Sequence, residues 1–243
     1  MLSIISYGSG SSGNCYCVSD GKAVVMLDCG FPYGMIQELT GYMVPDAVFV
    51  THEHKDHSMA VEKFLKVGIP VYMTQGTLDA LSLAPEIAGL VHVLSCKSIA
   101  NINGICVTPF ATQHDAAEPC GFLLDDGEDR LLYATDTYFL KYRFRRITKM
   151  MLEANHSYDI VQARVQKGEI SKGFANRLMK SHFALENLLT FLSANDLSSL
   201  KEIWLVHLSA ENADPARFWH DIMARTGVPV YVAAKQGGVL SRI

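Results

Sequence analysis

The sequence predicts an α/β fold, because strand-like and helical runs alternate along the chain and no linker interrupts them. Apolar runs predict four buried strands, at 47–50, 105–110, 131–134 and 203–206. Helices are expected at 58–66 and from Ala184 onward. The chain has 243 residues, of which 49% are hydrophobic, enough for one sizeable core. We therefore expect a single domain over residues 1–243.

A cluster of ionisable side chains follows the first of these strands. His52, His54, Asp56 and His57 lie within six residues, between the strand at 47–50 and the expected helix. Imidazole and carboxylate are ligands that suit zinc and similar divalent metals. Alternate side chains of an extended stretch share a side, so His52 and His54 are expected to bind one ion. Asp56 and His57, at the start of the next helix, suit a second ion.

Three further candidate ligands follow the other predicted strands. His114 comes after the strand at 105–110, Asp136 after 131–134 and His207 after 203–206. An ionisable residue at the end of an apolar strand, repeated three times, indicates a functional site more than packing. The sequence thus offers seven candidate ligands for a two-metal site.

These motifs resemble the metallo-β-lactamase superfamily of binuclear metallohydrolases, whose His-x-His-x-Asp-His motif is matched at 52–57. The chain is most similar to the YycJ/WalJ-like branch, described as DNA exonucleases. The matching stretches are 8–14, 114–119, 135–137, 153–156 and 207–209. The resemblance implies a four-layer αββα sandwich and two divalent ions, zinc or manganese. It also implies that Asp136 bridges the ions and that Asp28 supports the ligands from behind.

The activity implied is hydrolysis of a phosphodiester, as a DNA exonuclease with a metal-bound hydroxide as nucleophile. Asp56, Asp136 and His182 would carry the chemistry. His182 precedes the helix that opens at Ala184, and a helix N-terminus favours an anion. We expect it to protonate the leaving oxygen or to bind the phosphate, although a structural role is equally compatible with the sequence.

The loop 8–14 is rich in glycine and serine. Without the resemblance, a tight turn between the first two strands would explain it. In the family this loop lies beside the metals, so Ser12 and Asn14 become candidate substrate contacts. His156, in the matching stretch 153–156, is interpreted as structural.

Charge is distributed unevenly. The net charge is −4, yet residues 141–180 hold ten basic and three acidic residues, a local charge of +7. The run from Lys141 to Arg146 interleaves aromatic and basic side chains, a pattern that suits single-stranded nucleic acid. A solvated helix face is the alternative. We expect DNA as the partner, contacted by Arg143, Arg145 and Arg146.

Two other function classes remain open. The site could hydrolyse a small ester, thioester or lactam, although only 36 residues follow His207, too few for the C-terminal domain of glyoxalase II-like chains. The fold could instead serve a non-catalytic metal-binding interaction protein, but none of the ligands is missing. RNA-processing relatives carry large inserted domains that are absent between Asp136 and His207.

The first residues lack the basic start of a signal peptide, and no apolar run is long enough to cross a membrane. We therefore expect a cytoplasmic protein, with no membrane and no identifiable protein partner. The six scattered cysteines are expected to be reduced thiols, mostly in the core. Cys29 adjoins Asp28 and is the one cysteine that could reach a metal.

Overall fold

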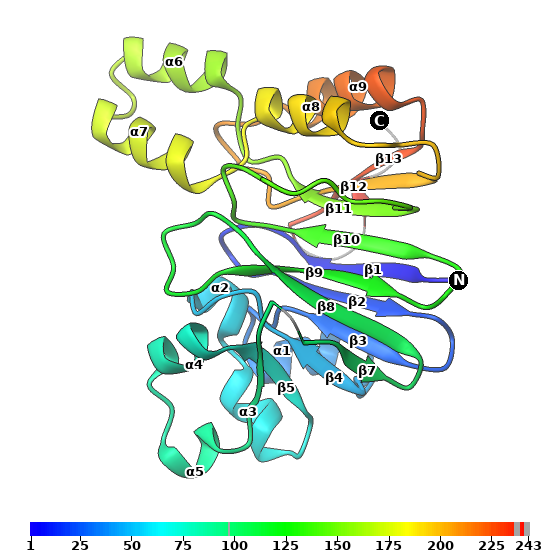
Figure 1. Cartoon of the computed structure of the whole chain (residues 1–243). Coiled ribbons are helices and arrows are strands. Elements are labelled where there is room, and N and C mark those ends of the chain that lie inside the picture. The colour runs from blue at the N-terminus through cyan, green and yellow to red at the C-terminus, as the bar shows by residue number, and fades with distance from the viewer. Residues whose placement is uncertain (97, 236–238, 241–243) are drawn as a thin grey trace.

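The computed structural model describes residues 1–96, 98–235 and 239–240. Two β-sheets lie face to face, and helices cover the outer face of each sheet (Figure 1). The α/β class and the four-layer αββα order expected from the sequence are both confirmed.

The first sheet has the strand order β1-β2-β3-β4-β5-β6. Its first three strands are antiparallel, and β3 to β6 run parallel. The strands are β1 (Ser3–Gly8), β2 (Cys15–Ser19), β3 (Val24–Leu27), β4 (Ala47–Phe49), β5 (Val71–Thr74) and β6 (His92–Leu94).

The second sheet has the order β14-β13-β12-β11-β10-β9-β8-β7, and β10 to β13 run parallel. Its strands are β7 (Ala100–Ile102), β8 (Ile105–Ala111), β9 (Cys120–Asp125), β10 (Arg130–Ala134), β11 (Lys149–Glu153), β12 (Glu202–Val206), β13 (Val230–Ala233) and β14 (Val239–Leu240). All four strands predicted from apolar runs are present, with ends shifted by no more than one residue.

The helices divide between the two sheets (Figure 1). Those on the first sheet are α1 (Tyr33–Leu39), α2 (Lys55–Ser58), α3 (Val61–Lys66), α4 (Gln75–Leu81) and α5 (Pro85–Ala88). Those on the side of the second sheet are α6 (Tyr158–Gln166), α7 (Lys172–Ser181), α8 (Leu185–Ala194) and α9 (Pro215–Thr226). In Figure 1, α8 and α9 cover the sheet, whereas α6 and α7 project beyond its edge. No helix among the described residues is long and apolar enough to cross a membrane.

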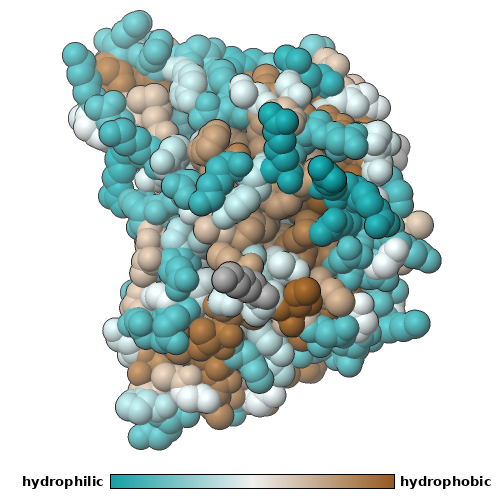
Figure 2. All heavy atoms as spheres, viewed as in Figure 1, coloured by the Kyte–Doolittle hydropathy of each residue, from teal (hydrophilic) through white to brown (hydrophobic). Residues whose placement is uncertain are grey.

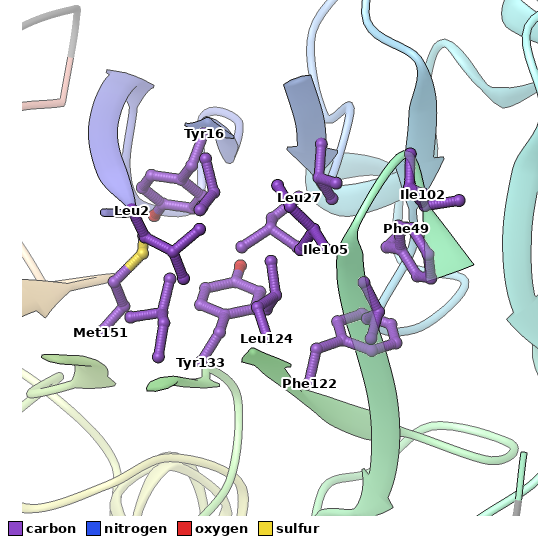
Figure 3. Packing of buried hydrophobic residues seen from close by; sticks show 14 of the residues in the cluster. Leu2, Tyr16, Leu27, Phe49, Ile102, Ile105, Phe122, Leu124, Tyr133 and Met151 are labelled. Carbon is purple, nitrogen blue, oxygen red and sulfur yellow. The ribbon is translucent and has the colours of Figure 1, made fainter. Parts of the chain in front are cut away.

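The apolar layer between the sheets holds the two halves together (Figure 3). Phe49 and Phe122 meet edge to face at 5.4 Å, and Tyr16 and Tyr133 at 5.7 Å. Burial of such large rings is a main source of stability for a fold of this kind. Two further apolar clusters join each sheet to its own helices.

The helix expected at 58–66 is interrupted. In a continuous helix the Ala60 N–H would donate to the carbonyl of Asp56. Here Ala60 donates to the carbonyl of Cys29 at 3.0 Å, and the carbonyl of Asp56 accepts from the N–H of Asn14 at 2.8 Å. The result is two short helices, α2 and α3, because contacts with neighbouring loops replace the helical hydrogen bonds.

Candidate metal centre

The predicted ligands gather where strands of both sheets end. Asp28 follows β3 and the motif at 52–57 follows β4, whereas Asp136 and His207 follow the parallel strands β10 and β12. Carboxyl ends of parallel strands commonly form the sites of layered α/β proteins. Asp28, Asp136 and His207 have φ values of 57°, 46° and 54°. Left-handed backbone is uncommon for residues other than glycine and concentrates at functional sites.

Three histidines form the first ligand cluster: His52, His54 and His114. His54 Nδ1 lies 3.0 Å from His52 Nε2 and 3.3 Å from His114 Nε2. His114 Nδ1 donates to the backbone carbonyl of Ser181 at 2.8 Å, which fixes the ring and leaves Nε2 facing the cluster. This trio is a suitable binding site for one ion.

The second cluster contains Asp56, His57, Asp136 and His207. Asp136 Oδ2 lies 2.7 Å from His57 Nε2 and 3.4 Å from Nε2 of His52, which belongs to the first cluster. The Asp136 carboxylate therefore stands between the two clusters, where a bridging ligand is needed. All seven predicted ligands are brought together.

The donor set fits divalent metal ions. His207 Nε2 is buried and has no hydrogen-bond partner, although it points toward Asp56 Oδ2 at 3.6 Å. A buried polar atom without a partner is costly, and a bound cation would satisfy it. Burial, followed by the neighbouring His57, lowers the pKa of His52 well below its usual range. A neutral imidazole is the form that binds metal.

Asp28 lies directly behind His57 and is completely buried. Its Oδ2 accepts hydrogen bonds from His57 Nδ1 at 2.8 Å and from the Tyr133 hydroxyl at 2.6 Å. Its Oδ1 accepts from the Thr51 N–H at 2.8 Å. The carboxylate thus turns His57 Nε2 toward the metal cluster, the geometry expected of a supporting residue.

The loop 8–14 holds the second cluster in place through the side chain of Asn14. The Asn14 side-chain amide donates to the carbonyls of Gly10 and Asp56 at 3.1 and 3.2 Å, and Asn14 is fully buried. Asn14 therefore holds the ligand segment and does not line the cleft. The segment that carries Asp56 approaches the backbone of Gly30 closely. Only glycine fits there, since a Cβ atom at Gly30 would lie 1.7 Å from the carbonyl oxygen of Asp56.

Glu153, at the end of β11, is a site residue that the sequence reasoning missed. It is completely buried, and its Oε1 lies 2.7 Å from His182 Nδ1 and 3.0 Å from His207 Nδ1. Its Oε2 accepts from the backbone N–H groups of Thr137 and Phe183, both at 3.0 Å. One carboxylate thus orients both a predicted ligand and His182. Its signal was available in the matching stretch 153–156, where a carboxylate ends an apolar strand.

The helix after His182 opens where the sequence predicted, with Ala184 as the N-cap of α8. His182 caps the C-terminus of α7, its N–H donating to the carbonyl of Leu178, and it precedes α8 without belonging to it. The contact with Glu153, and not a helix N-terminus, holds the His182 ring beside Asp136. Burial lowers the pKa of His182, but the Glu153 and Asp136 carboxylates raise it to about 11. The ring lies 3.3 Å from Asp136 Oδ1.

A cleft of about 470 Å³ opens over these residues, a size suited to a small ligand or one end of a larger one. Besides the ligands, its walls come from α7 and from residues 208–212. Ser11 lines the cleft, whereas Ser12 is exposed outside it. The indentation of the surface below the α6–α7 lobe is visible in Figure 2.

The basic run 141–146 lies outside this cleft, and Arg143, Arg145 and Arg146 are all exposed. Strongly hydrophilic side chains gather in front of β10 and β11 in Figure 2. The run is not helical, and from Lys141 to Arg145 exposed cations alternate with half-buried aromatics. Phe144 packs edge to face on Phe110 at 4.9 Å. Tyr142 and Phe144 are half-buried and pack against the apolar cluster of the second sheet, and their role as base-stacking groups stays a prediction.

All six cysteines are free. Four are buried, as expected, whereas Cys106 is half-buried and Cys96 is exposed. Cys29 is buried in the apolar layer between the first sheet and its helices and is not part of any ligand cluster among the described residues. His156 is also buried and belongs to no such cluster.

A four-layer αββα sandwich with a histidine and aspartate site at its strand ends defines a metallohydrolase of the metallo-β-lactamase fold. Residues 25–208 match the family model described as the beta-lactamase superfamily domain, and the chain belongs to this superfamily. It is 25% identical over 220 residues to exodeoxyribonuclease WalJ of Streptococcus pneumoniae, covering 84% of this chain and 80% of that protein.

Two other relatives extend the comparison. Exodeoxyribonuclease YycJ of Bacillus anthracis is 24% identical over 221 residues, which cover 84% of this chain and 81% of that protein. The metallo-beta-lactamase fold protein YhfI from Bacillus subtilis superposes with a TM-score of 0.72 at 16% identity, over 97% of each chain. The resemblance to the YycJ/WalJ-like branch is confirmed.

Proposed function

We propose that the protein is a binuclear metal-dependent phosphodiester hydrolase that acts on DNA as an exonuclease. The observation that carries the proposal is His182, a histidine outside the seven ligands that Glu153 holds at 2.7 Å beside Asp136. Hydrolysis of an ordinary phosphodiester expels a poor leaving group, which needs a proton. Similarity to two exodeoxyribonucleases over 84% of the chain supports DNA as the substrate.

The two ligand clusters would hold two divalent ions, zinc or manganese. When bound, the ions supply a water acidic enough to attack near neutral pH and positive charge beside the phosphoryl oxygens. Imidazole-rich ligation suits zinc, whereas the carboxylates of Asp56 and Asp136 also suit manganese.

The residues of the chain then have separate tasks. The Asp136 carboxylate lies between the two clusters and holds them next to each other. Asp28 fixes the ring of the ligand His57. Because His182 Nδ1 is engaged by Glu153, its Nε2 is the atom left to meet the substrate. It would donate a proton to the departing oxygen, or hold that oxygen's phosphate.

The basic run 141–146 would bind the polynucleotide away from the cleaved bond. Its arginines are exposed and lie outside the cleft, so they can contact phosphates without touching the metals. Contacts of this kind position a nucleic acid and make its affinity depend on salt.

A panel of end-labelled single- and double-stranded DNA and RNA tests the proposal, with Mn²⁺ or Zn²⁺ added back after chelation. We expect metal-dependent release of nucleotides from DNA ends. Cleavage of esters, thioesters or lactams with no action on any nucleic acid would contradict the proposal and favour a small-molecule hydrolase.

A further inference from the structure

One face of α7 forms a wall of the metal cleft. Phe174, Arg177, Leu178 and Ser181 line it together, at the spacing i, i+3, i+4 and i+7 that places side chains on one side of a helix. Phe174 keeps 51% of its surface exposed. The exposed part of the Phe174 ring is therefore available to a ligand in the cleft.

The acidic groups at the cleft rim are neutralised. Arg177 donates to Asp115 Oδ2 through Nε and Nη2, at 3.0 and 2.8 Å. Arg164 lies 2.8 Å from the carboxylate of Glu211, another residue that lines the cleft. Unpaired carboxylates here would repel a phosphate, so these pairs prepare the rim for an anionic substrate.

The same helix is rigidly connected to the metal site. Its last residue, Ser181, accepts the hydrogen bond of the ligand His114, and its cap is His182. At 1.5 Å per residue, Phe174 lies about 10 Å along the helix from Ser181, roughly the rise of three stacked nucleotides. A ring at this position can contact a base of the same strand whose phosphate is being cleaved.

We propose that α7 selects the substrate, with Phe174 stacking on a base of single-stranded DNA near the cleaved bond and Arg177 shielding it from Asp115. The inference rests on the proposed function and adds the group that recognises the polymer. Every base offers a flat face to an aromatic ring. This contact therefore selects for the presence of a base and not for a particular DNA sequence.

Abasic sites placed one at a time at the first six or so positions from the cleaved end test this contact. Wild-type protein should lose about five- to 150-fold in affinity at one position, the usual effect of losing one base–aromatic stack. Phe174→Ala should show that loss on intact DNA and no further loss at the abasic position, whereas Phe174→Trp should retain binding. Affinity is measured with the metal-loaded protein and a fluorescent oligonucleotide that has non-hydrolysable linkages at its end, so that no cleavage occurs.

Phe139→Ala is the matched control, because Phe139 is 53% exposed but lies outside the cleft. It should bind DNA like wild type. Phe174→Ala should keep the metal content of the wild type, because Phe174 belongs to neither ligand cluster.

If Phe174→Ala binds and cleaves intact DNA like wild type, the inference is wrong while the proposed function stands. An equal loss in Phe139→Ala, or an equal abasic effect in wild type and Phe174→Ala, would also overturn it. A wild-type protein that cleaves no DNA with either metal would overturn the proposed function itself, and this inference with it.

Discussion

Replacing His182 by alanine removes the proposed proton donor and leaves all seven predicted ligands in place. The wild-type ring is held by Glu153 at 2.7 Å, and the surrounding carboxylates raise its pKa to about 11, so it carries a proton at neutral pH. Two bound cations would lower that pKa toward the working pH, where a general acid is most effective. A leaving-group acid contributes about 100- to 10,000-fold, or about 3–5 kcal/mol of barrier.

We therefore expect His182→Ala to keep its full metal content and lose about 100- to 10,000-fold in the rate of DNA hydrolysis. On bis(p-nitrophenyl) phosphate the loss should be much smaller, because nitrophenolate leaves without a proton. Rates on both substrates, metal content and a melting curve together make the assay. Loss of metal would make His182 a ligand, and an unchanged rate on DNA would refute its role as an acid.

Other changes test the supporting geometry. Asp136→Asn should lower hydrolysis by about 100-fold or more and weaken metal binding with little change in melting temperature, since its carboxylate spans both clusters; near-wild-type hydrolysis would reject this role. Gly30→Ala should lower metal content because its Cβ would lie 1.7 Å from the Asp56 carbonyl, whereas Gly34→Ala, with no neighbour within 4 Å, should not; equal metal content in both would contradict this reasoning. Replacing the exposed Arg143, Arg145 and Arg146 by alanine should weaken binding to long DNA and make that binding depend less on salt. The rate of hydrolysis of a small phosphodiester should not change. Equal loss on both substrates would instead give these arginines a structural role.

The local motif and the strand ends were readable from the sequence because each depends on a short stretch of chain. Alternation placed His52 and His54 together, and an ionisable residue after each apolar run located His114, Asp136 and His207. The resemblance added Asp28 and the order of the layers.

What the sequence could not supply depends on long-range contacts. The pairing of Glu153 with His182 joins residues 29 apart, and the break between α2 and α3 arises from hydrogen bonds of Asn14 and Cys29 to the ligand segment. Likewise, alternating cations and aromatics fit a nucleic-acid surface as well as a solvated helix face. The structure shows no helix at 141–146 and packs Phe144 against Phe110, a contact between residues that are far apart in the sequence.

The central claim is that two ions occupy the paired clusters. Metal analysis of gently purified protein, after loading with Zn²⁺ or Mn²⁺ and removal of excess ion, tests it most directly. We predict close to two equivalents per chain, falling to about one when Asp56 or His207 of the second cluster is replaced by alanine. A wild-type protein that never exceeds one equivalent under any loading condition would contradict the binuclear site.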